Sequence, residues 1–298
     1  MNQMNQDNIR DLITQTAGEQ PDSLAPVSGG LSNAGKFKAQ VCGQDWMIKI
    51  LPGNAVRDLW YKELAVRSDD RMACPKKHHL FEDGTLCLMS PWIEGESLET
   101  RLLRGSKEDL QHFGQQAAQI LLKLHQIPFV YPGYVKQLRD RVYRACAQAE
   151  ELQLTFPQHE QCCDFLRSSM ENYSADHVCF VHKDIRPENF VVKDEQLYLI
   201  DFDNGSLGER ATDFSYLTTM GGEQFFPFSK EVLQIYLSEI DFDDFWKKNL
   251  LYSTLQVVEY AIWKYQTKGK QVKLQAENLC AQYEGFARML PTWWINGI

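Results

Sequence analysis

The chain has 298 residues, of which 44% are hydrophobic, and it carries a formal net charge of −9 at pH 7. This length can form one large domain or two lobes, and the hydrophobic content is sufficient for a core. The negative charge argues against a nucleic-acid partner, because phosphate backbones need a basic protein face. It is compatible with a cationic substrate, although many enzymes are mildly acidic for solubility alone.

Two further features of the composition concern the cellular setting. No stretch approaches the roughly 20 apolar residues that span a bilayer, and the polar start lacks the basic head and apolar run of a signal peptide. We therefore expect a cytoplasmic protein without membrane insertion. Eight cysteines are scattered without a CxxC pair, which predicts reduced thiols, and the adjacent Cys162 and Cys163 are expected to share a helix.

The first third of the chain predicts an antiparallel sheet with one helix. A short helix is expected over residues 7–16, and residues 18–26 read as a polar connection with two prolines. Alternating apolar residues predict strands over 36–41 and 45–51, joined as a hairpin at Gly43.

A helix and a second hairpin follow. Asn54 is suited to cap a helix over residues 54–68, in which apolar residues recur at helical spacing. Residues 78–82 and 85–89 flank Asp83-Gly84, a dipeptide typical of tight hairpins.

After residue 95 the pattern becomes helical. An amphipathic stripe predicts a long helix over residues 110–125. Further helices are expected over residues 134–154, 159–173, 232–237, 245–265 and 274–290, interrupted by short strands at 178–181, 190–192 and 197–200. The layout predicts a small β-rich lobe followed by a larger helical lobe.

The interrupting strands carry the residues best suited to chemistry. Phosphoryl transfer from a nucleotide needs a carboxylate at the acceptor hydroxyl and oxygen ligands for magnesium. Asp184 and Asn189 lie in one loop, where Asp184 can orient the hydroxyl and Asn189 can offer magnesium a neutral oxygen. Asp201 ends an apolar strand and is the main candidate metal ligand, with Asp203 as a second.

Each of these residues alone would more simply be explained as part of a turn or a strand end. Together they form a His-x-Asp-x4-Asn motif, followed after twelve residues by an aspartate at the end of an apolar strand. That combination is rare by chance, so it favours a functional interpretation.

The segment from Val181 to Val191 resembles the catalytic loop shared by protein kinases and by the aminoglycoside phosphotransferase and choline kinase superfamily. The second group fits better, because only twelve residues separate Asp201 from Asp213 and leave no room for a long activation segment. The resemblance implies an α+β, protein-kinase-like fold with an N-terminal nucleotide-binding lobe and a mainly helical C-terminal lobe.

The resemblance also implies boundaries. Residues 1–90 would form the nucleotide-binding lobe, led by a helix and connection over 1–24, and residues 91–298 the helical lobe. Within the second lobe it implies a helical insertion at 134–177, the catalytic loop at 178–203 and acceptor-binding helices at 204–298.

By the same resemblance, the N-terminal lobe binds ATP or GTP with Mg²⁺. Lys49 would hold the phosphates and pair with Glu63, fourteen residues later on a helix. A lysine among apolar strand residues independently favours such a partner. The remaining nucleotide contacts would come from a glycine-rich turn with Gly30, Ser32 and Asn33, and from the backbone of a hinge at Ser90 and Trp92.

Two residues depart from the small-molecule enzymes. Lys183 stands where they usually have glycine, and Arg186 where histidine is common. An extra cation there could stabilise charge that develops on the phosphate. His125 and His182 are expected to be structural, since this chemistry needs no histidine base.

The acceptor is expected to contact the helical C-terminal third, which is rich in acids and aromatic rings. Carboxylates beside aromatic faces suit an ammonium-bearing substrate, and the candidates are Glu223, Glu259 and Trp263. The aromatic residues also fall at helical spacing, which favours an ordinary role in the helical core for any one of them.

Four functions were compared. The favoured one is a kinase for an amine-bearing metabolite of the choline, ethanolamine or thiamine type, and an antibiotic phosphotransferase would differ only in its pocket. A non-catalytic pseudokinase that binds a protein partner is disfavoured by the intact catalytic residues, and a protein kinase by the missing activation segment. Oligomeric state and nucleotide preference cannot be read from the sequence.

Overall fold

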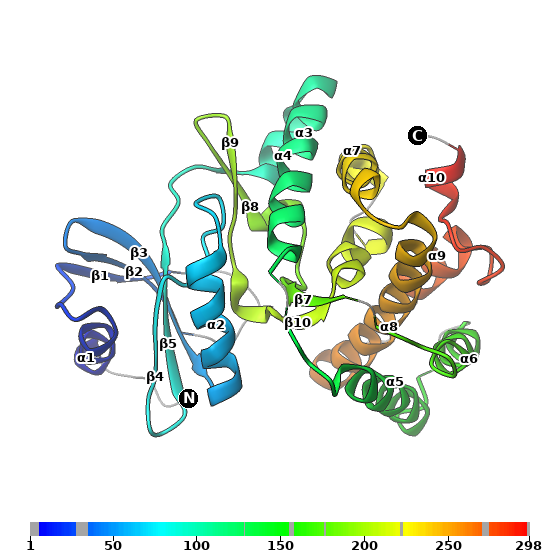
Figure 1. Ribbon diagram of the computed structural model, residues 1–298, viewed down its shortest axis with the longest axis horizontal. Helices are drawn as coiled ribbons and strands as arrows, with labels where there is room; N and C mark the ends of the chain where they lie inside the picture. Colours follow the sequence, from blue (N-terminus) through cyan, green and yellow to red (C-terminus); the bar gives the residue numbers. More distant parts are fainter. Residues whose placement is uncertain are drawn as a thin grey trace. The chain divides into compact units, whose positions relative to one another are not determined.

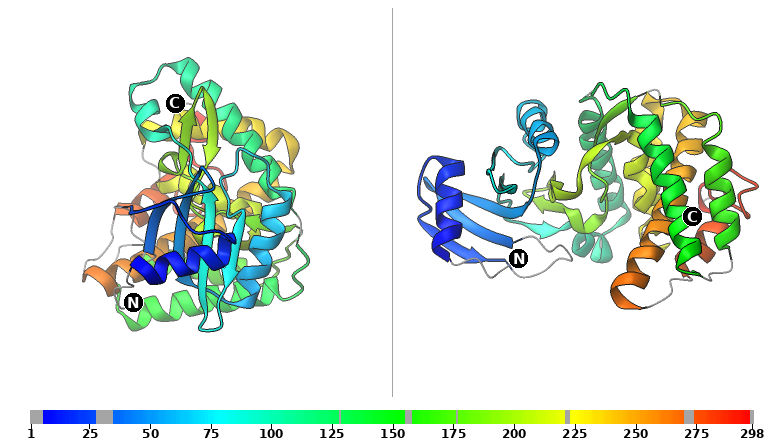
Figure 2. Two further views of the ribbon diagram at one scale, coloured as in Figure 1. Left: turned by 90° about the vertical axis from the view of Figure 1, so that its left-hand side faces the viewer. Right: turned by 90° about the horizontal axis from the view of Figure 1, so that it is seen from below.

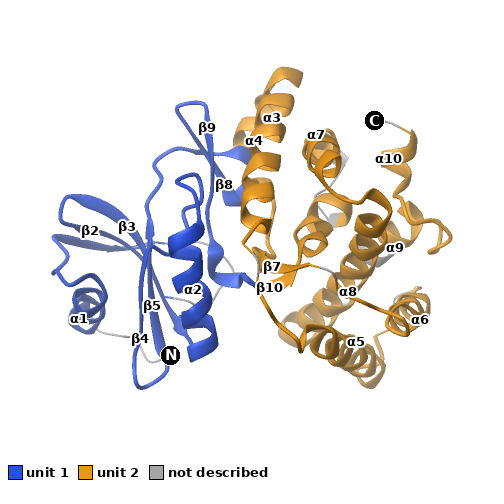
Figure 3. Cartoon of the chain, in the orientation of Figure 1, with its two compact units in different colours: residues 1–98, 188–206 blue, residues 99–187, 207–298 orange. Residues whose placement is uncertain are grey.

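The computed structural model describes residues 6–27, 35–127, 129–154, 158–175, 177–220, 223–269 and 274–296. The chain forms two compact units, neither of which is continuous in sequence (Figure 3). Unit 1 comprises residues 1–98 and 188–206, and unit 2 comprises residues 99–187 and 207–298. The first unit therefore extends beyond the lobe boundary that we predicted after residue 90, and it takes in part of the catalytic loop.

Unit 1 is built on a five-stranded antiparallel sheet with the strand order β1-β2-β3-β5-β4 (Figure 1). The two predicted hairpins are β2–β3 and β4–β5. The edge strand β1 was not expected, since its segment reads as a polar, proline-containing connection. The strands are β1 (Ser23–Pro26), β2 (Gly35–Val41), β3 (Gln44–Pro52), β4 (Lys77–Leu80) and β5 (Thr85–Pro91).

The alternation of side chains gives the sheet two different faces. One face carries a buried apolar cluster that includes Ile48, Ile50 and Met89, and the N-terminal helix α1 (Gln6–Ala17) covers it with Ile9 and Ile13 (Figure 2). Side chains on successive strand residues point to opposite faces. The residues between these apolar positions therefore point to the other face, which α1 leaves uncovered.

Helix α2 (Ala55–Arg67) follows β3 and packs beside β4. Its predicted cap is confirmed: Asn54 accepts hydrogen bonds from the backbone N–H groups of Val56 (3.1 Å) and Arg57 (3.0 Å). The helix buries Tyr61 and Leu64.

The second part of unit 1 is a small sheet in the order β6-β8-β9, whose last two strands belong to the segment 178–203 that we predicted as the catalytic loop. A parallel bridge between Met72 and Leu199 attaches β9 to the segment that precedes β4. Gly95 lies so close to the backbone of Val192 that an added Cβ would be 2.4 Å from its carbonyl oxygen. The strands are β6 (Glu96–Ser97), β8 (Phe190–Lys193) and β9 (Gln196–Leu199).

Unit 2 is mainly helical, with one two-stranded sheet formed by β7 (Val178–Val181) and β10 (Ser206–Glu209). The helices α4 and α7 pack against each other, and Gly114 allows α4 to approach Glu231. The helices are α3 (Leu98–Arg104), α4 (Lys107–His125), α5 (Tyr134–Glu151), α6 (His159–Ser169), α7 (Phe226–Tyr236), α8 (Phe242–Lys268), α9 (Leu274–Gln282) and α10 (Thr292–Asn296).

Short non-α helices occupy the loops of both units. Asp213 lies in a 3-10 helix, which is followed by a π-helix. These elements are η1 (Pro187–Asn189), η2 (Phe202–Asn204), η3 (Arg210–Phe214), η4 (Tyr216–Met220), η5 (Glu223–Phe225) and η6 (Leu237–Glu239).

The α+β class with an antiparallel sheet and a helix-rich second part is confirmed. The eight cysteines are free thiols, seven of them buried, and Cys162 and Cys163 share α6. Within the described ranges, no helix has the length and apolar content needed to cross a bilayer.

The close approach at Gly95 leads to a stability prediction. We expect Gly95→Ala to lower the free energy of unfolding by about 2–3 kcal/mol, because the added methyl group would clash with backbone that cannot easily move. Gly43→Ala is the matched control: its φ is +73° but nothing lies within 4 Å of an added Cβ. It should cost only about 1 kcal/mol of backbone strain. Urea unfolding measures both, and equal losses would contradict the steric argument.

Candidate functional site

Unit 1 contains a cavity of about 470 Å³, which is within the size range of small-molecule sites. Its wall includes the face of the five-stranded sheet that α1 does not cover and the loop that contains Asn189. Residues from both segments of the unit line it, including Val27, Lys36, Met47, Lys49, Leu88, Ser90, Trp92, Ile93, Gly95, Asn189, Val191, Asp201 and Asp203.

A buried lysine between two carboxylates is the centre of this cavity. Lys49 is 7% exposed, forms an ion pair with Asp201 and lies 3.0 Å from Oδ1 of Asp203. A buried ammonium group is costly unless it is paired and hydrogen-bonded. The two aspartates therefore supply the partners that the sequence predicted this lysine would need.

The two carboxyl groups titrate differently although they share one lysine. Burial and the hydrogen bond with Asp201 raise the pKa of Asp203 to about 6. Burial opposes ionisation of Asp201 as well, but the hydrogen bond with Asp203 and the positive charge of Lys49 hold its pKa well below the ordinary value. Two close carboxylates favour one ionised and one more easily protonated group.

The turn that positions these carboxylates is held by α2. Asp201 adopts a left-handed backbone conformation with φ of 69° and ψ of 53°. The Tyr61 hydroxyl donates to the carbonyl of Phe202 at 3.3 Å, and Arg57 donates to the carbonyl of Asp203. These contacts fix the backbone on which both aspartates stand.

The donor set fits a magnesium ion. Asn189, Asp201 and Asp203 line one cavity and offer an amide oxygen and two carboxylates, and oxygen ligands suit this hard cation. The described residues hold no cluster of three or more His, Cys, Asp or Glu side chains that could bind a metal. A cation here would depend on few protein ligands, as magnesium commonly does when phosphates complete its coordination.

The predicted hinge also lines the cavity. The backbone N–H of Trp92 already donates to the carbonyl of Asp45 at 3.1 Å, so a base could use it only by displacing that bond. The Trp92 ring is held by a hydrogen bond from its Nε1 to Glu94 (2.7 Å) and by Lys38, whose ammonium lies 4.7 Å from the ring centroid. The role of Ser90 and Trp92 in nucleotide binding remains a prediction.

The predicted partner of Lys49 is wrong. Glu63 lies on the exposed side of α2, with 49% of its side chain accessible, and pairs with Arg67 at 2.8 Å one turn later. The buried face of the helix is instead formed by Tyr61 and Leu64. The glycine-rich turn with Gly30, Ser32 and Asn33 lies outside the described residues.

Unit 2 carries the predicted catalytic aspartate. Asp184 is partly buried, and the Nε of Arg186 lies 3.2 Å from its Oδ1. The preceding residue, Lys183, has a φ of +67°. This left-handed conformation costs a residue with a side chain about 1 kcal/mol or more, which gives a physical reason for the glycine that similar enzymes usually have there.

The strained backbone of the loop is held by a buried carboxylate. Asp213 accepts hydrogen bonds from the backbone N–H groups of His182 (2.8 Å) and Lys183 (2.5 Å). It also accepts from Nε2 of His125 (3.0 Å), whose Nδ1 is 2.6 Å from the Tyr236 hydroxyl. Complete burial would raise the pKa of Asp213, but the hydrogen bonds from His125 and from the His182 backbone lower it below the ordinary value.

A second buried carboxylate supports the segment just before Asp213. Glu209, at the end of β10, is 2% exposed and accepts from the hydroxyls of Tyr173 and Tyr252, the latter at 2.7 Å. Burial raises the pKa of the neighbouring Tyr134 hydroxyl to about 12. These hydroxyls therefore stay protonated and serve as donors at neutral pH.

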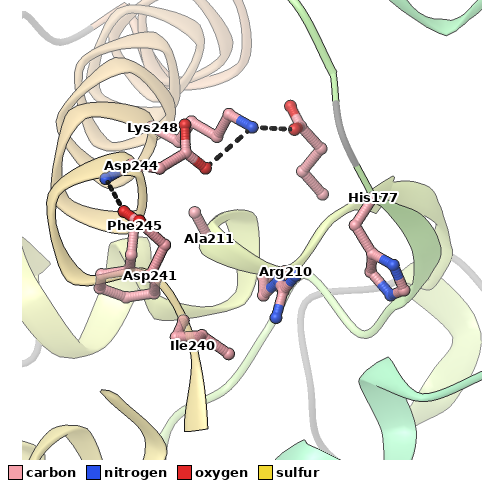
Figure 4. A pocket seen from close by; sticks show the side chains of 9 residues that line it. His177, Arg210, Ala211, Ile240, Asp241, Asp244, Phe245 and Lys248 are labelled. Atoms are coloured by element: carbon pink, nitrogen blue, oxygen red, sulfur yellow. Dashed lines mark hydrogen bonds and ion pairs between the residues drawn. The ribbon is translucent and has the colours of Figure 1, made fainter. Parts of the chain in front are cut away.

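The Glu209 carboxylate also forms an ion pair with a lysine. Lys248 on α8 lies 2.8 Å from Oε1 of Glu209 and 3.0 Å from Oδ2 of Asp244. Figure 4 shows this lysine bonded to Asp244 at one side of a small cavity, with Arg210 and His177 at the other. The cavity measures only about 40 Å³, enough for one or a few water molecules. We interpret the cluster as structural support for the backbone that leads to Asp213.

Among the residues predicted to bind the acceptor, Glu259 and Trp263 each have partners within unit 2. Arg141 binds Glu259 with two hydrogen bonds of 2.6 and 2.5 Å, which contradicts a role for this carboxylate in binding an amine. Trp263 stacks on Tyr260 and has the Lys268 ammonium 5.8 Å from its ring centroid, so its own helix already supplies a cation. Glu223 lies in η5, and its side chain is outside the described part.

Three structural contributors were missed from the sequence. Asp213 was noted only for its short distance from Asp201 in the sequence, Glu209 was not singled out, and Lys36 was seen only as part of a strand. The signal for Lys36 was its place in a hairpin with Lys49, because the two residues pair across the strands. No sequence signal shows that Glu209 is buried among three tyrosines.

Comparison with known proteins identifies the class. The model of the phosphotransferase enzyme family matches residues 23–246. The chain therefore belongs to this family, as its catalytic-loop resemblance predicted. The predicted activity class, ATP-dependent phosphoryl transfer to a hydroxyl group of a small molecule, is confirmed at that level. No curated protein sequence matches the chain.

Solved structures show the same fold at low sequence identity. A spectinomycin phosphotransferase in complex with ADP and spectinomycin is 16% identical, with a TM-score of 0.60, over 94% of this chain and 92% of that chain. The aminoglycoside phosphotransferase APH(4)-Ia, in a ternary complex with AMP-PNP and hygromycin B, is 14% identical with a TM-score of 0.62, over 94% and 99%.

A third structure, a macrolide 2'-phosphotransferase from Brachybacterium faecium, is 15% identical with a TM-score of 0.56, over 89% of this chain and 93% of that chain. All three similarities extend over most of both chains. The protein-kinase-like α+β fold is therefore confirmed.

The Asp213 network generates a prediction for stability and its pH dependence. Asp213→Asn should lower the free energy of unfolding by about 2–4 kcal/mol, because it weakens the bonds to two buried N–H groups and His125. Because the folded-state pKa of Asp213 is depressed, its contribution is present above the ordinary value of 3.8 and is lost as pH falls below it. The variant should therefore lose less stability on acidification than the wild type.

Urea unfolding between pH 3 and pH 7 tests this prediction. Asp140→Asn is the control, since this aspartate is 51% exposed and pairs with Lys136 one turn away. That variant should stay within about 0.5 kcal/mol of the wild type. Parallel pH profiles for wild type and Asp213→Asn would contradict the assigned role.

Proposed function

We propose that this enzyme transfers the γ-phosphate of a magnesium nucleotide to a hydroxyl group of a small molecule, with Asp184 orienting and accepting the proton of that hydroxyl. The proposed binding of the phosphoryl donor rests on one observation. The same cavity of unit 1 is lined by Lys49, Asn189, Asp201 and Asp203. Phosphoryl transfer depends on positioning and charge stabilisation, and these four residues offer the groups that such a site needs.

Each donor-side residue would act through its own chemistry. Asp201, Asp203 and Asn189 would hold the magnesium ion, which when bound neutralises charge on the phosphates. Lys49 would contact phosphate oxygens once the ion takes the carboxylates. The low pKa of Asp201 keeps this ligand ionised at neutral pH, and a bound cation would favour the ionised form of Asp203 as well.

On the acceptor side, Asp184 stands on a loop whose backbone is fixed by Asp213. A fixed carboxylate can hold a hydroxyl in the orientation needed for attack, and orientation is a large part of the catalytic effect in such reactions. The neighbouring Arg186, whose Nε lies 3.2 Å from Asp184 Oδ1, would stabilise charge on the transferred group.

Two acceptor classes remain. An amine-bearing metabolite of the choline, ethanolamine or thiamine type was our first expectation, but Glu259 no longer supports it because Arg141 neutralises this carboxylate. An antibiotic acceptor is favoured by the fold neighbours, whose names refer to spectinomycin, hygromycin B and macrolides. At 14–16% identity these names set candidates to test and no more.

The acceptor can be identified by nucleotide turnover with two panels. One panel contains choline, ethanolamine and thiamine, and the other contains spectinomycin, hygromycin B, further aminoglycosides and a macrolide. Acceptor-dependent release of ADP and the mass of the phosphorylated product assign the class. Turnover with neither panel would reject both acceptor classes while leaving the donor site to be tested by nucleotide binding.

The catalytic prediction concerns Asp184. We expect Asp184→Asn to lower kcat about a thousandfold or more, because the amide cannot accept the hydroxyl proton. The KM for ATP should change by less than about threefold, because the residue is assigned to the acceptor. Asp194→Asn, in the exposed turn between β8 and β9, is the control and should keep wild-type kinetics. Full activity of Asp184→Asn would refute the mechanism.

A separate prediction concerns Asp201. Asp201→Asn should weaken the binding of ATP in the presence of magnesium by about tenfold or more, because a charged metal ligand and a partner of Lys49 are lost. Binding of adenosine without magnesium should be unaffected. Calorimetric titration at several magnesium concentrations measures both, and unchanged affinity at limiting magnesium would remove Asp201 from the metal site.

A further inference from the structure

A second lysine stands beside Lys49 in the cavity of unit 1. Lys36 on β2 is the cross-strand partner of Lys49 on β3, so the two side chains leave the same face of the sheet. Both residues line the cavity. The Lys36 side chain is only 11% exposed, which is low for a residue that usually keeps its ammonium group in water.

The charges around this pair explain why it can be tolerated. Like charges directly opposite each other on neighbouring strands repel. Here two ammonium groups face the two carboxylates of Asp201 and Asp203, so the local formal charges balance. Lys49 contacts both carboxylates, whereas Lys36 lies 3.9 Å from Oδ2 of Asp201, at the outer limit of an ion pair.

The balance changes when a divalent cation binds. The carboxylates of Asp201 and Asp203 would coordinate the metal, and both lysines would lose their anionic partners. Two buried ammonium groups without counter-charges are unfavourable, and phosphate oxygens are the anions that a nucleotide brings to the same cavity. Lys36 loses less ion-pair energy than Lys49 when the carboxylates bind a cation, because its contact with Asp201 is longer than those of Lys49.

We propose that Lys36 is a second phosphate-binding residue of the nucleotide site, which contacts the diphosphate or triphosphate of the donor after magnesium engages Asp201. This inference rests on the proposed function, because it requires a magnesium nucleotide in the cavity of unit 1. It adds a charged contact from β2 to the one that Lys49 provides from β3.

A simpler role must be separated from this one. Lys36 could serve only to balance Asp201 and to form part of the cavity wall. In that case its removal would disturb all ligands of the cavity alike, whatever their phosphate content. A phosphate-binding role instead predicts an effect that grows with the charge of the ligand.

The test is a series of ligands that share one base. We would measure dissociation constants of ATP, ADP, AMP and adenosine by calorimetric titration of wild type and Lys36→Met, with magnesium present. Methionine keeps the length and the apolar stem of the side chain and removes its charge. We expect binding of ATP and ADP to weaken about tenfold, whereas adenosine binding should stay within about twofold.

Two further variants control the comparison. Lys36→Arg retains a cation and should restore ATP affinity to within about threefold of the wild type. Lys62→Met removes the same charge from the surface of α2, where the side chain is 60% exposed and pairs with Asp58 one turn away. It should leave all four dissociation constants unchanged, and thermal melting verifies that each variant is folded.

The outcomes distinguish this inference from the proposed function. If wild type does not bind ATP with magnesium, the donor half of the proposed function fails and Lys36 has no phosphate to bind. If wild type binds ATP and Lys36→Met binds it equally well, only the role of Lys36 is refuted. Equal losses for ATP and adenosine would likewise refute it, because they assign Lys36 to the cavity wall.

Discussion

The organisation of unit 1 depends on one buried ammonium group, that of Lys49, which needs anionic partners. Its partners, Asp201 and Asp203, come from a segment far away in sequence, so the ion pairs tie residues 188–206 to the five-stranded sheet. Ion pairs of this kind often add little net stability, since desolvation offsets attraction. Their value here is that they keep the charged groups in place on one wall of the cavity, as the proposed exchange of partners with a cation and phosphates requires.

Unit 2 meets a related constraint with backbone groups in place of an ammonium. The loop of Asp184 passes through a left-handed conformation at Lys183. Without hydrogen-bond acceptors, the backbone N–H groups there would not be fixed in direction. Asp213 holds two of them and is itself held by His125. Strain of this kind persists where surrounding structure determines the conformation, and the buried support from Glu209 continues the same arrangement toward α8.

Much of the fold could be predicted, because its signals are local. Hydrophobic alternation predicted the first hairpin and the Asp83-Gly84 dipeptide the second, and the Asn54 cap is a short-range contact. The edge strand β1 was missed, since its residues are exposed and its pairing with β2 is a tertiary contact. The spacing predicted candidate metal ligands, which line one cavity, whereas it did not predict the partner of Lys49. Whether Glu63 faces inward depends on the rotation of α2, which Tyr61 and Leu64 determine by burial.

The discontinuous make-up of unit 1 has a consequence for how the protein is made. Residues 188–206 complete its small sheet and supply Asn189, Asp201 and Asp203 to its cavity. During synthesis, Lys49 therefore lacks its carboxylate partners until residues 188–206 have followed residues 99–187 out of the ribosome. Domains generally fold as units from the N-terminus. Here the cavity of unit 1 is instead completed only after residues 99–187, the first segment of unit 2, have been synthesised.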